Sequence, residues 1–197
     1  DNNDAASYRC VVTNTYGSTN SSPATLTVMN PNPCIPVANP DFESGFNLAG
    51  GGYIATHWTE WEAVPGVVVG YDETVTVHGG AHSQRIRVSG TGATSGGVYQ
   101  RVPVTAGNAY AVSVWIYADT ALTSCYLGVD PAGGTNAASG VTWSSATTNV
   151  AWVQKTWAGM ATANYLTVFY KVATPDNVKR NGYFDDGTPL GLGGTLQ

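Results

Sequence analysis

Charged side chains make up 11% of the 197 residues, against ~25% in an average domain, and the formal net charge is −5. The eight Lys and Arg residues are scattered, which argues against a nucleic-acid partner because phosphate binding needs clustered basic side chains. No apolar run reaches the ~20 residues that a membrane-spanning helix needs. The 24 glycines, 10 prolines and 11% aromatic residues favour short strands joined by turns.

The first 29 residues predict a β-hairpin, with alternation over 4–12, a turn at Thr13–Gly17 and a second strand over 24–28. The spacing of Asp4, Ala6, Tyr8 and Cys10, followed by Asn14 and Gly17, resembles the last two strands of an immunoglobulin-like domain. In that family the tyrosine forms the tyrosine corner and the cysteine pairs with one on an earlier strand. We expect residues 1–29 to be the C-terminal hairpin of an incomplete domain of this kind, and a native hairpin packed on the next domain is the alternative.

The rest of the chain divides by composition. The Pro and Asn residues at 30–33 predict an extended linker, because proline cannot continue a central strand. A domain of ordinary size is expected over 34–190, followed by a flexible, glycine-rich tail at 191–197. We expect the hairpin at 1–29 and the domain at 34–190 to belong to a longer protein. The neighbouring domains of that protein would be partners of the domain at 34–190.

The domain at 34–190 shows no helical periodicity but many alternating stretches separated by Gly-, Asn- or Thr-rich turns. This spacing predicts an all-β, antiparallel sandwich or barrel. The expected strands are 67–71, 74–78, 82–89, 97–104, 109–118, 124–130, 151–160, 164–173 and 182–186.

Three of these strands have a face that mixes rings with polar groups. In 109–118 one face is apolar and the other carries Trp115 and Tyr117. Tyr99 and Arg101 share a face of 97–104, and Phe169 lies on the polar face of 164–173. Large rings are costly to leave in water, so such faces are candidate ligand-binding surfaces.

Several short motifs occur in an order that resembles bacterial carbohydrate-binding modules with the galactose-binding-like jelly roll. These motifs are Asn39–Phe46, His57–Thr59, Gly79–Ile86, Gly97–Val102 and Tyr183–Asp186. The stretch Leu127–Thr135, with Trp143 and Ser144, also resembles a variety attached to secreted bacterial multidomain proteins. The resemblance implies a jelly-roll β-sandwich, non-catalytic polysaccharide binding and a secreted or cell-surface location.

We predict that a platform of rings stacks on the sugar while polar groups bond its hydroxyls. Trp115 and Tyr117 would form the platform, and Trp61 is a loop candidate. Gln100 corresponds to a ligand-contacting glutamine in some related modules, although alternation places it inward. The remaining predicted ligand-binding residues are Tyr99, Arg101, Tyr126 and Phe169, whereas Trp143, Trp152 and Trp157 are expected to pack.

The resembled modules also carry a structural calcium ion that joins the first strand to the last. Carried over by motif, its ligands would be Glu43, Asp185 and the backbone around Ser83, with Asp41 and Gln84 as further candidates. Mixed carboxylate and carbonyl oxygens suit calcium. The alternative is that Asp185 and Asp186 only form a turn.

Catalysis has weaker support, and we expect no enzyme. Glu60 and Glu62 would share a face if 58–63 is extended, but the sequence has no G-x-S-x-G or H-E-x-x-H motif. Cys125 lies on an apolar face, so it either pairs with Cys34 or is a buried thiol. A structural or adhesion module of an extracellular protein is the alternative to glycan binding.

Overall fold

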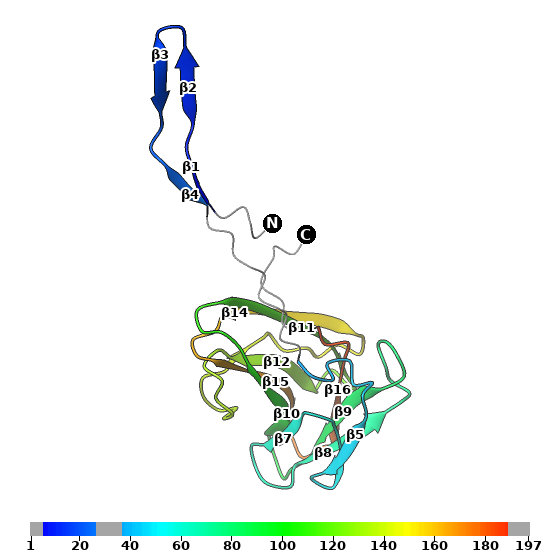
Figure 1. The fold of residues 1–197 in the computed structure, drawn as a ribbon. Coiled ribbons are helices and arrows are strands. Elements are labelled where there is room, and N and C mark those ends of the chain that lie inside the picture. The colour runs from blue at the N-terminus through cyan, green and yellow to red at the C-terminus, as the bar shows by residue number, and fades with distance from the viewer. Residues whose placement is uncertain (1–5, 27–36, 189–197) are drawn as a thin grey trace. The chain divides into compact units, whose positions relative to one another are not determined.

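The computed structural model describes residues 6–26 and 37–188, so the predicted linker at 30–33, the tail at 191–197 and Cys34 lie outside the described residues. The chain divides into two compact units, Asp1–Pro33 and Cys34–Gln197. Within the described residues every regular element is a strand and every pairing is antiparallel (Figure 1). No helix capable of crossing a membrane is found in that part of the chain. The all-β, antiparallel prediction is confirmed.

The first unit is an interrupted hairpin. Strand β1 (Ala6–Tyr8) pairs with β4 (Ala24–Leu26), and β2 (Val11–Asn14) pairs with β3 (Gly17–Asn20). The turn is tighter than expected, because Asn14 pairs with Gly17 and the Asn14 side chain accepts a hydrogen bond from Tyr16 N. All residues of β2 and β3 are exposed, so the hairpin has no core of its own. Its origin in an immunoglobulin-like domain stays a prediction.

The second unit is a sandwich of two five-stranded sheets (Figure 1). Sheet 1 has the order β13-β12-β15-β10-β7, and its strands are β7 (Thr59–Glu62), β10 (Thr94–Pro103), β12 (Ser124–Asp130), β13 (Thr142–Trp143) and β15 (Tyr165–Thr174). Sheet 2 has the order β14-β11-β16-β9-β8, and its strands are β8 (Val68–Glu73), β9 (Ser83–Val88), β11 (Ala109–Ala118), β14 (Val153–Met160) and β16 (Arg180–Asp185). A separate hairpin joins β5 (Phe46–Ala49) to β6 (Gly52–Ala55).

The expected strand at 74–78 is wrong, because carboxylate and hydroxyl groups fold this segment into a turn. Glu73 Oε1 accepts hydrogen bonds from the N–H groups of Val75 and Thr76, and Ser83 Oγ donates to Thr76 O. Strands β5, β6 and β7 were not predicted, since each is only four residues long and shows little alternation. The turn between β5 and β6 contains Gly50 and Gly51, both of which have positive φ.

An aromatic cluster in the core connects the two sheets. Tyr170 of β15 stacks on Phe184 of β16, with ring centroids 5.0 Å apart and planes within 5°. Tyr170 also stacks on Trp58, which precedes β7, with centroids 4.6 Å apart. Phe42 contacts Trp58 and Tyr170 at 5.7 and 6.3 Å. The cluster therefore ties sheet 1, sheet 2 and the first described segment of the domain together.

Cys125 lies in this core as a fully buried free thiol. Burial raises its pKa above the ordinary value for a cysteine. Gly182 of the facing sheet lies so close that a Cβ there would be 2.6 Å from Cys125 Sγ. Of the two alternatives for Cys125, the structure therefore shows the buried thiol.

Tyr170 provides a test of the core. Its hydroxyl is buried and has no hydrogen-bond partner among the described residues. We expect Tyr170→Phe to raise the free energy of unfolding by roughly 1 kcal/mol, because the unpaired hydroxyl is desolvated without compensation. Urea unfolding followed by tryptophan fluorescence measures the change.

Tyr110 supplies the matched control. It is equally buried, but its hydroxyl oxygen accepts a 2.9 Å hydrogen bond from Thr105 N. Tyr110→Phe should therefore lower the free energy of unfolding by about 1 kcal/mol. Equal destabilisation by the two substitutions would contradict the assignment of an unpaired hydroxyl to Tyr170.

Candidate functional site

The structure divides the eight predicted ligand-binding residues between two sheets. Trp115 and Tyr117 lie on β11 of sheet 2, whereas the residues on sheet 1 are Trp61, Tyr99, Gln100, Arg101, Tyr126 and Phe169. The prediction of one shared platform is wrong. Alternation identifies the face of a strand on which a side chain lies, but it does not identify the sheet that the strand joins.

Five rings form a continuous surface on the outer face of sheet 1, which we call the aromatic face: Trp61, Tyr99, Tyr126, Trp143 and Phe169. The strand register brings them together, since Tyr99 of β10 lies opposite Phe169 of β15, and Gly128 of β12 lies next in the same row. Centroid distances between neighbouring rings run from 5.5 Å for Tyr99 and Phe169 to 6.4 Å for Trp61 and Phe169. The ring centroid of Trp143 lies 6.0 to 6.3 Å from those of Phe169, Tyr126 and Trp61.

Phe169 has a different role from the predicted one, whereas Trp143 packs against its neighbours as expected. Phe169 has no exposed surface, so it supports the other rings and does not itself contact a ligand. Trp143, expected to pack, is half-buried and lies opposite Gly128, with its ring where a side chain at that position would be. Only the pairing of β13 with β12 reveals this position, since a two-residue strand leaves no pattern in the sequence.

A cleft of about 310 Å³ opens beside the aromatic face. Two of its lining residues, Trp61 of β7 and Lys171 of β15, lie on either side of Gly97 of β10 in the strand register. Gly97 has no side chain, so the indole of Trp61 packs over it, with Nε1 3.1 Å from the position that a Cβ would occupy. The cleft is lined by Trp61, Glu62, Ala63, Ser95, Thr135, Asn136, Ala137, Ala138 and Lys171.

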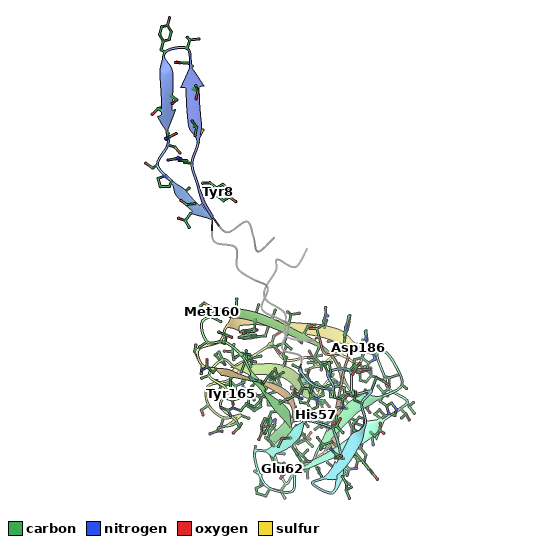
Figure 2. All side chains as sticks on the ribbon, viewed as in Figure 1. Tyr8, His57, Glu62, Met160, Tyr165 and Asp186 are labelled. Carbon is green, nitrogen blue, oxygen red and sulfur yellow. The ribbon has the colours of Figure 1, made fainter. Side chains whose placement is uncertain are left out.

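Buried polar contacts hold the loop at 131–140 against this cleft. Asp130, at the end of β12, is 4% exposed and accepts a hydrogen bond from Ala132 N at 2.8 Å. Arg101 Nε donates to Gly133 O at 2.8 Å, and the guanidinium lies 3.6 Å from the ring centroid of Tyr165, a residue that Figure 2 labels. The structure thus gives Arg101 a positioning role for the loop.

Gln100, the other polar candidate on β10, points into the domain. Its amide accepts a hydrogen bond from Ala38 N and donates to Ala38 O and His57 O. These contacts join β10 to the segment that precedes β5. The predicted ligand contact by Gln100 is wrong, because the side chain is buried and its amide is engaged with the backbone.

Lys171 is the cation of the aromatic face. Its Nζ lies 4.2 Å from the ring centroid of Tyr126 and 4.0 Å from that of Trp143. Burial lowers the pKa of this lysine below its ordinary value. The sequence pattern placed Lys171 on the same face as Phe169 but gave no reason to select it.

The outer face of sheet 2 carries a second group of rings. His78 stacks on Trp115 with centroids 4.1 Å apart, and His78 Nδ1 lies 2.6 Å from Oδ2 of Asp186, a residue that Figure 2 labels. Tyr117 contacts Tyr183 and Trp152 at 5.5 and 5.7 Å. The stacked histidine therefore covers one face of the Trp115 indole.

The carboxylate pair considered for catalysis is turned away from the aromatic face. Trp61 lies between Glu60 and Glu62 in β7, so alternation directs both carboxylates to the opposite side of the strand. Glu62 accepts hydrogen bonds from Gly66 N and Val68 N at 2.6 and 2.7 Å. Burial, and then the neighbouring charge of Glu62, raise the pKa of Glu60.

The predicted calcium ligands meet at one turn, residues 78–82. Glu43 Oε1 accepts hydrogen bonds from the N–H groups of Ala81 and His82, both at 2.8 Å. Asp185 Oδ2 accepts from His78 N and Gly79 N at 2.7 and 3.2 Å, and Asp185 is fully buried. Burial raises the pKa of Asp185 to about 6, although hydrogen bonds from the backbone oppose this change.

The other predicted metal ligands have different contacts. Ser83 Oγ donates to a backbone carbonyl, and the buried Gln84 amide bonds to the backbone of Tyr53 and Ala55. Asp41 accepts a hydrogen bond from Glu43 N at 3.4 Å. In the described residues no three His, Cys, Asp or Glu side chains converge closely enough to hold a metal. Glu43 and Asp185 are therefore the two predicted ligands that the structure brings to this turn, and backbone N–H groups donate to both carboxylates.

Comparison with protein-family models and with curated protein sequences finds no match. Solved structures do match in fold. A family 61 carbohydrate-binding module, TmCBM61, in complex with β-1,4-galactotriose has a TM-score of 0.54 and 17% identity, over 80% of this chain and 97% of that one. The C-terminal family 22 carbohydrate-binding module of Clostridium thermocellum Xyn10B has a TM-score of 0.54 and 16% identity, over 85% and 100%.

A catalytic protein contains the same fold. The enzymatically active domain of bacteriophage CBA120 tailspike protein 4 has a TM-score of 0.57 and 13% identity, over 81% of this chain and 21% of that one. At these identities the likeness establishes the jelly-roll β-sandwich and leaves the ligand to be argued from the site.

Proposed function

We propose that this chain binds a polysaccharide, without catalysis, in the cleft beside the aromatic face of sheet 1. The observation that carries the proposal is the half-buried indole of Trp61, which packs over Gly97 and lines this cleft. The apolar C–H face of a sugar stacks on such a ring. Ser95, Thr135 and Asn136 line the same cleft and offer hydrogen bonds to hydroxyl groups.

The distribution of acids supports binding without catalysis. Glycoside hydrolysis needs two carboxylates that flank one bond. Asp130 lies on the outer face of sheet 1 but is buried and bonded to its own loop. Glu62 lines the cleft, but both of its carboxylate oxygens accept hydrogen bonds from backbone N–H groups, and Glu60 lies on the side of β7 away from Trp61. The oligosaccharide-binding and xylan-binding modules that share the fold add support for a glycan ligand.

The proposal includes a setting and an alternative. A secreted or cell-surface protein, with further domains beside this one, is the setting in which such modules act as accessories. A structural or adhesion role is favoured by the first unit, in which Val11 and Val12 are 57% and 60% exposed. A glycan array without hits, together with self-association in light scattering, would favour that alternative.

We also propose that calcium stabilises the domain at the turn of residues 78–82. The support is that Glu43 and Asp185 are 142 positions apart in the sequence, yet both carboxylates accept hydrogen bonds from backbone N–H groups of this one turn. Bound there, the ion would supply positive charge to two carboxylates and receive further oxygens from the backbone. The aromatic face of sheet 1 would not take part.

Trp61→Ala tests the binding surface. Loss of the stacking ring should weaken glycan binding by ~1–3 kcal/mol, by analogy with the stacking of flat π systems on aromatic side chains. Affinity electrophoresis against soluble xylan and galactan, followed by calorimetry with the best oligosaccharide, measures this loss.

Trp115→Ala is the matched control, because it removes the same ring from the outer face of sheet 2. We expect it to leave glycan affinity unchanged. Loss of binding in Trp115→Ala but not in Trp61→Ala would place the site on sheet 2. Absence of binding by the unaltered protein to every glycan tested would reject the proposed function.

Calcium is tested by melting the domain with and without chelator. An ion that binds only the folded state stabilises it by ~2.7 kcal/mol at a concentration one hundredfold above Kd. EDTA should therefore lower the melting temperature by several degrees. Asp185→Asn should remove the difference between calcium and EDTA, and elemental analysis should find the ion in the unaltered protein only.

Asp176→Asn is the control for the calcium experiment. Asp176 forms an ion pair with Arg180 at 2.8 Å in a different turn, so its substitution should lower the melting temperature equally in calcium and in EDTA. Melting curves that do not respond to EDTA, in a protein without bound metal, would leave Asp185 and Asp186 as turn residues only.

A further inference from the structure

Lys171 is a cation without an anionic partner at the edge of the proposed glycan cleft. It forms no ion pair with any carboxylate of residues 6–26 and 37–188. On the two adjacent strands, the residues directly opposite Lys171 are Gly97, which has no side chain, and Tyr126, which is uncharged. The two rings that contact its ammonium fix its position but supply no negative charge.

The acids closest to this position in the fold are bonded elsewhere. Glu62 lines the same cleft, but its two carboxylate oxygens accept hydrogen bonds from Gly66 N and Val68 N. Asp130, farther along the outer face, accepts from Ala132 N. Neither carboxylate forms an ion pair with Lys171. Half burial of the ammonium removes part of its water, and the lowered pKa of Lys171 reflects that loss.

The distance between Trp61 and Lys171 across β7, β10 and β15 defines where the anionic group of a ligand would lie. Trp61 and Lys171 are two strands apart, so their backbones are ~10 Å from each other. The indole itself covers Gly97, since its Nε1 lies 3.1 Å from the position that a Cβ of Gly97 would occupy. A sugar ring stacked on this indole would carry a substituent on the side of Lys171. A neutral hydroxyl there would leave the ammonium without a counter-charge.

We infer that the cleft selects an acidic polysaccharide, whose negatively charged group binds the ammonium of Lys171 while its sugar ring stacks on Trp61. The inference rests on the proposed function and adds the class of glycan. A uronic acid carboxylate and a sulfate ester share the required chemistry. Both accept charge-assisted hydrogen bonds from a lysine, which are stronger than those of neutral acceptors.

Calorimetry with three matched probes tests the inference: a neutral galacto-oligosaccharide, an oligogalacturonate of the same length and a sulfated galacto-oligosaccharide. The unaltered protein should bind an acidic probe roughly 10- to 150-fold more tightly than the neutral probe at low salt, the gain expected for a hydrogen bond to a charged group. The preference should shrink as salt is added, because the pair is partly exposed to solvent. Whichever acidic probe binds more tightly identifies the anionic group.

Three variants separate charge from packing. Lys171→Met keeps the apolar stem over Trp143 and should remove the preference while leaving affinity for the neutral probe within about threefold, whereas Lys171→Arg should retain the preference. Lys179→Met removes the same charge from an exposed turn and should change nothing. Thermal melting confirms that each variant is folded.

The outcomes also separate this inference from the proposed function. Equal affinity of the unaltered protein for neutral and acidic probes, or an equal loss for all probes in Lys171→Met, would overturn the inference and leave glycan binding intact. Failure of every probe to bind the unaltered protein would overturn both.

Discussion

The stacking of Tyr170 on Phe184 and Trp58 is the contact on which the surface of sheet 1 depends. Side chains alternate along a strand, so burying Tyr170 places its neighbours Phe169 and Lys171 on the outer face. A slip of one residue in β15 would expose Tyr170 and bury the lysine. The free energy gained by packing these rings therefore also determines which side chains a ligand meets.

The few charged residues of this protein are used mainly to hold loops. Asp130 and Arg101 position the loop at 131–140, Glu62 closes the loop at 66–68, and Glu73 organises the turn that follows β8. A β-sandwich of short strands has many turns, and carboxylates bonded to backbone N–H groups compensate donors that would otherwise lose water. Lys171 is different, because within residues 6–26 and 37–188 its ammonium contacts the rings of Tyr126 and Trp143 and no carboxylate.

The two sheets present surfaces of different character. On sheet 2 the ring of Trp115 is covered by His78, which Asp186 holds in place. On sheet 1 the rings surround Gly97 and Lys171 and open into a cleft. On sheet 2 a neighbouring ring thus covers Trp115, whereas on sheet 1 a cleft lies beside the rings.

The sequence alone determined the class of fold and the inner and outer faces of the long strands. Turn residues and alternation suffice for this, since they follow from local backbone geometry. They placed Tyr99, Phe169 and Trp115 on the faces opposite the core-facing residues of their strands, as the structure has them. The short strands β5, β6, β7 and β13 were missed because two to four residues carry too little pattern.

Tertiary structure alone decided which strands share a sheet, and so which outer residues form one surface. Strand order is set by long-range pairing, which leaves no local signal, and this separated Trp115 from Trp61 and joined Trp143 to Phe169. It also turned Gln100 and Arg101 into residues that hold the backbone. Lys171 became a candidate for ligand binding only when its strand neighbours were known, because the absence of a counter-charge is a property of the surroundings.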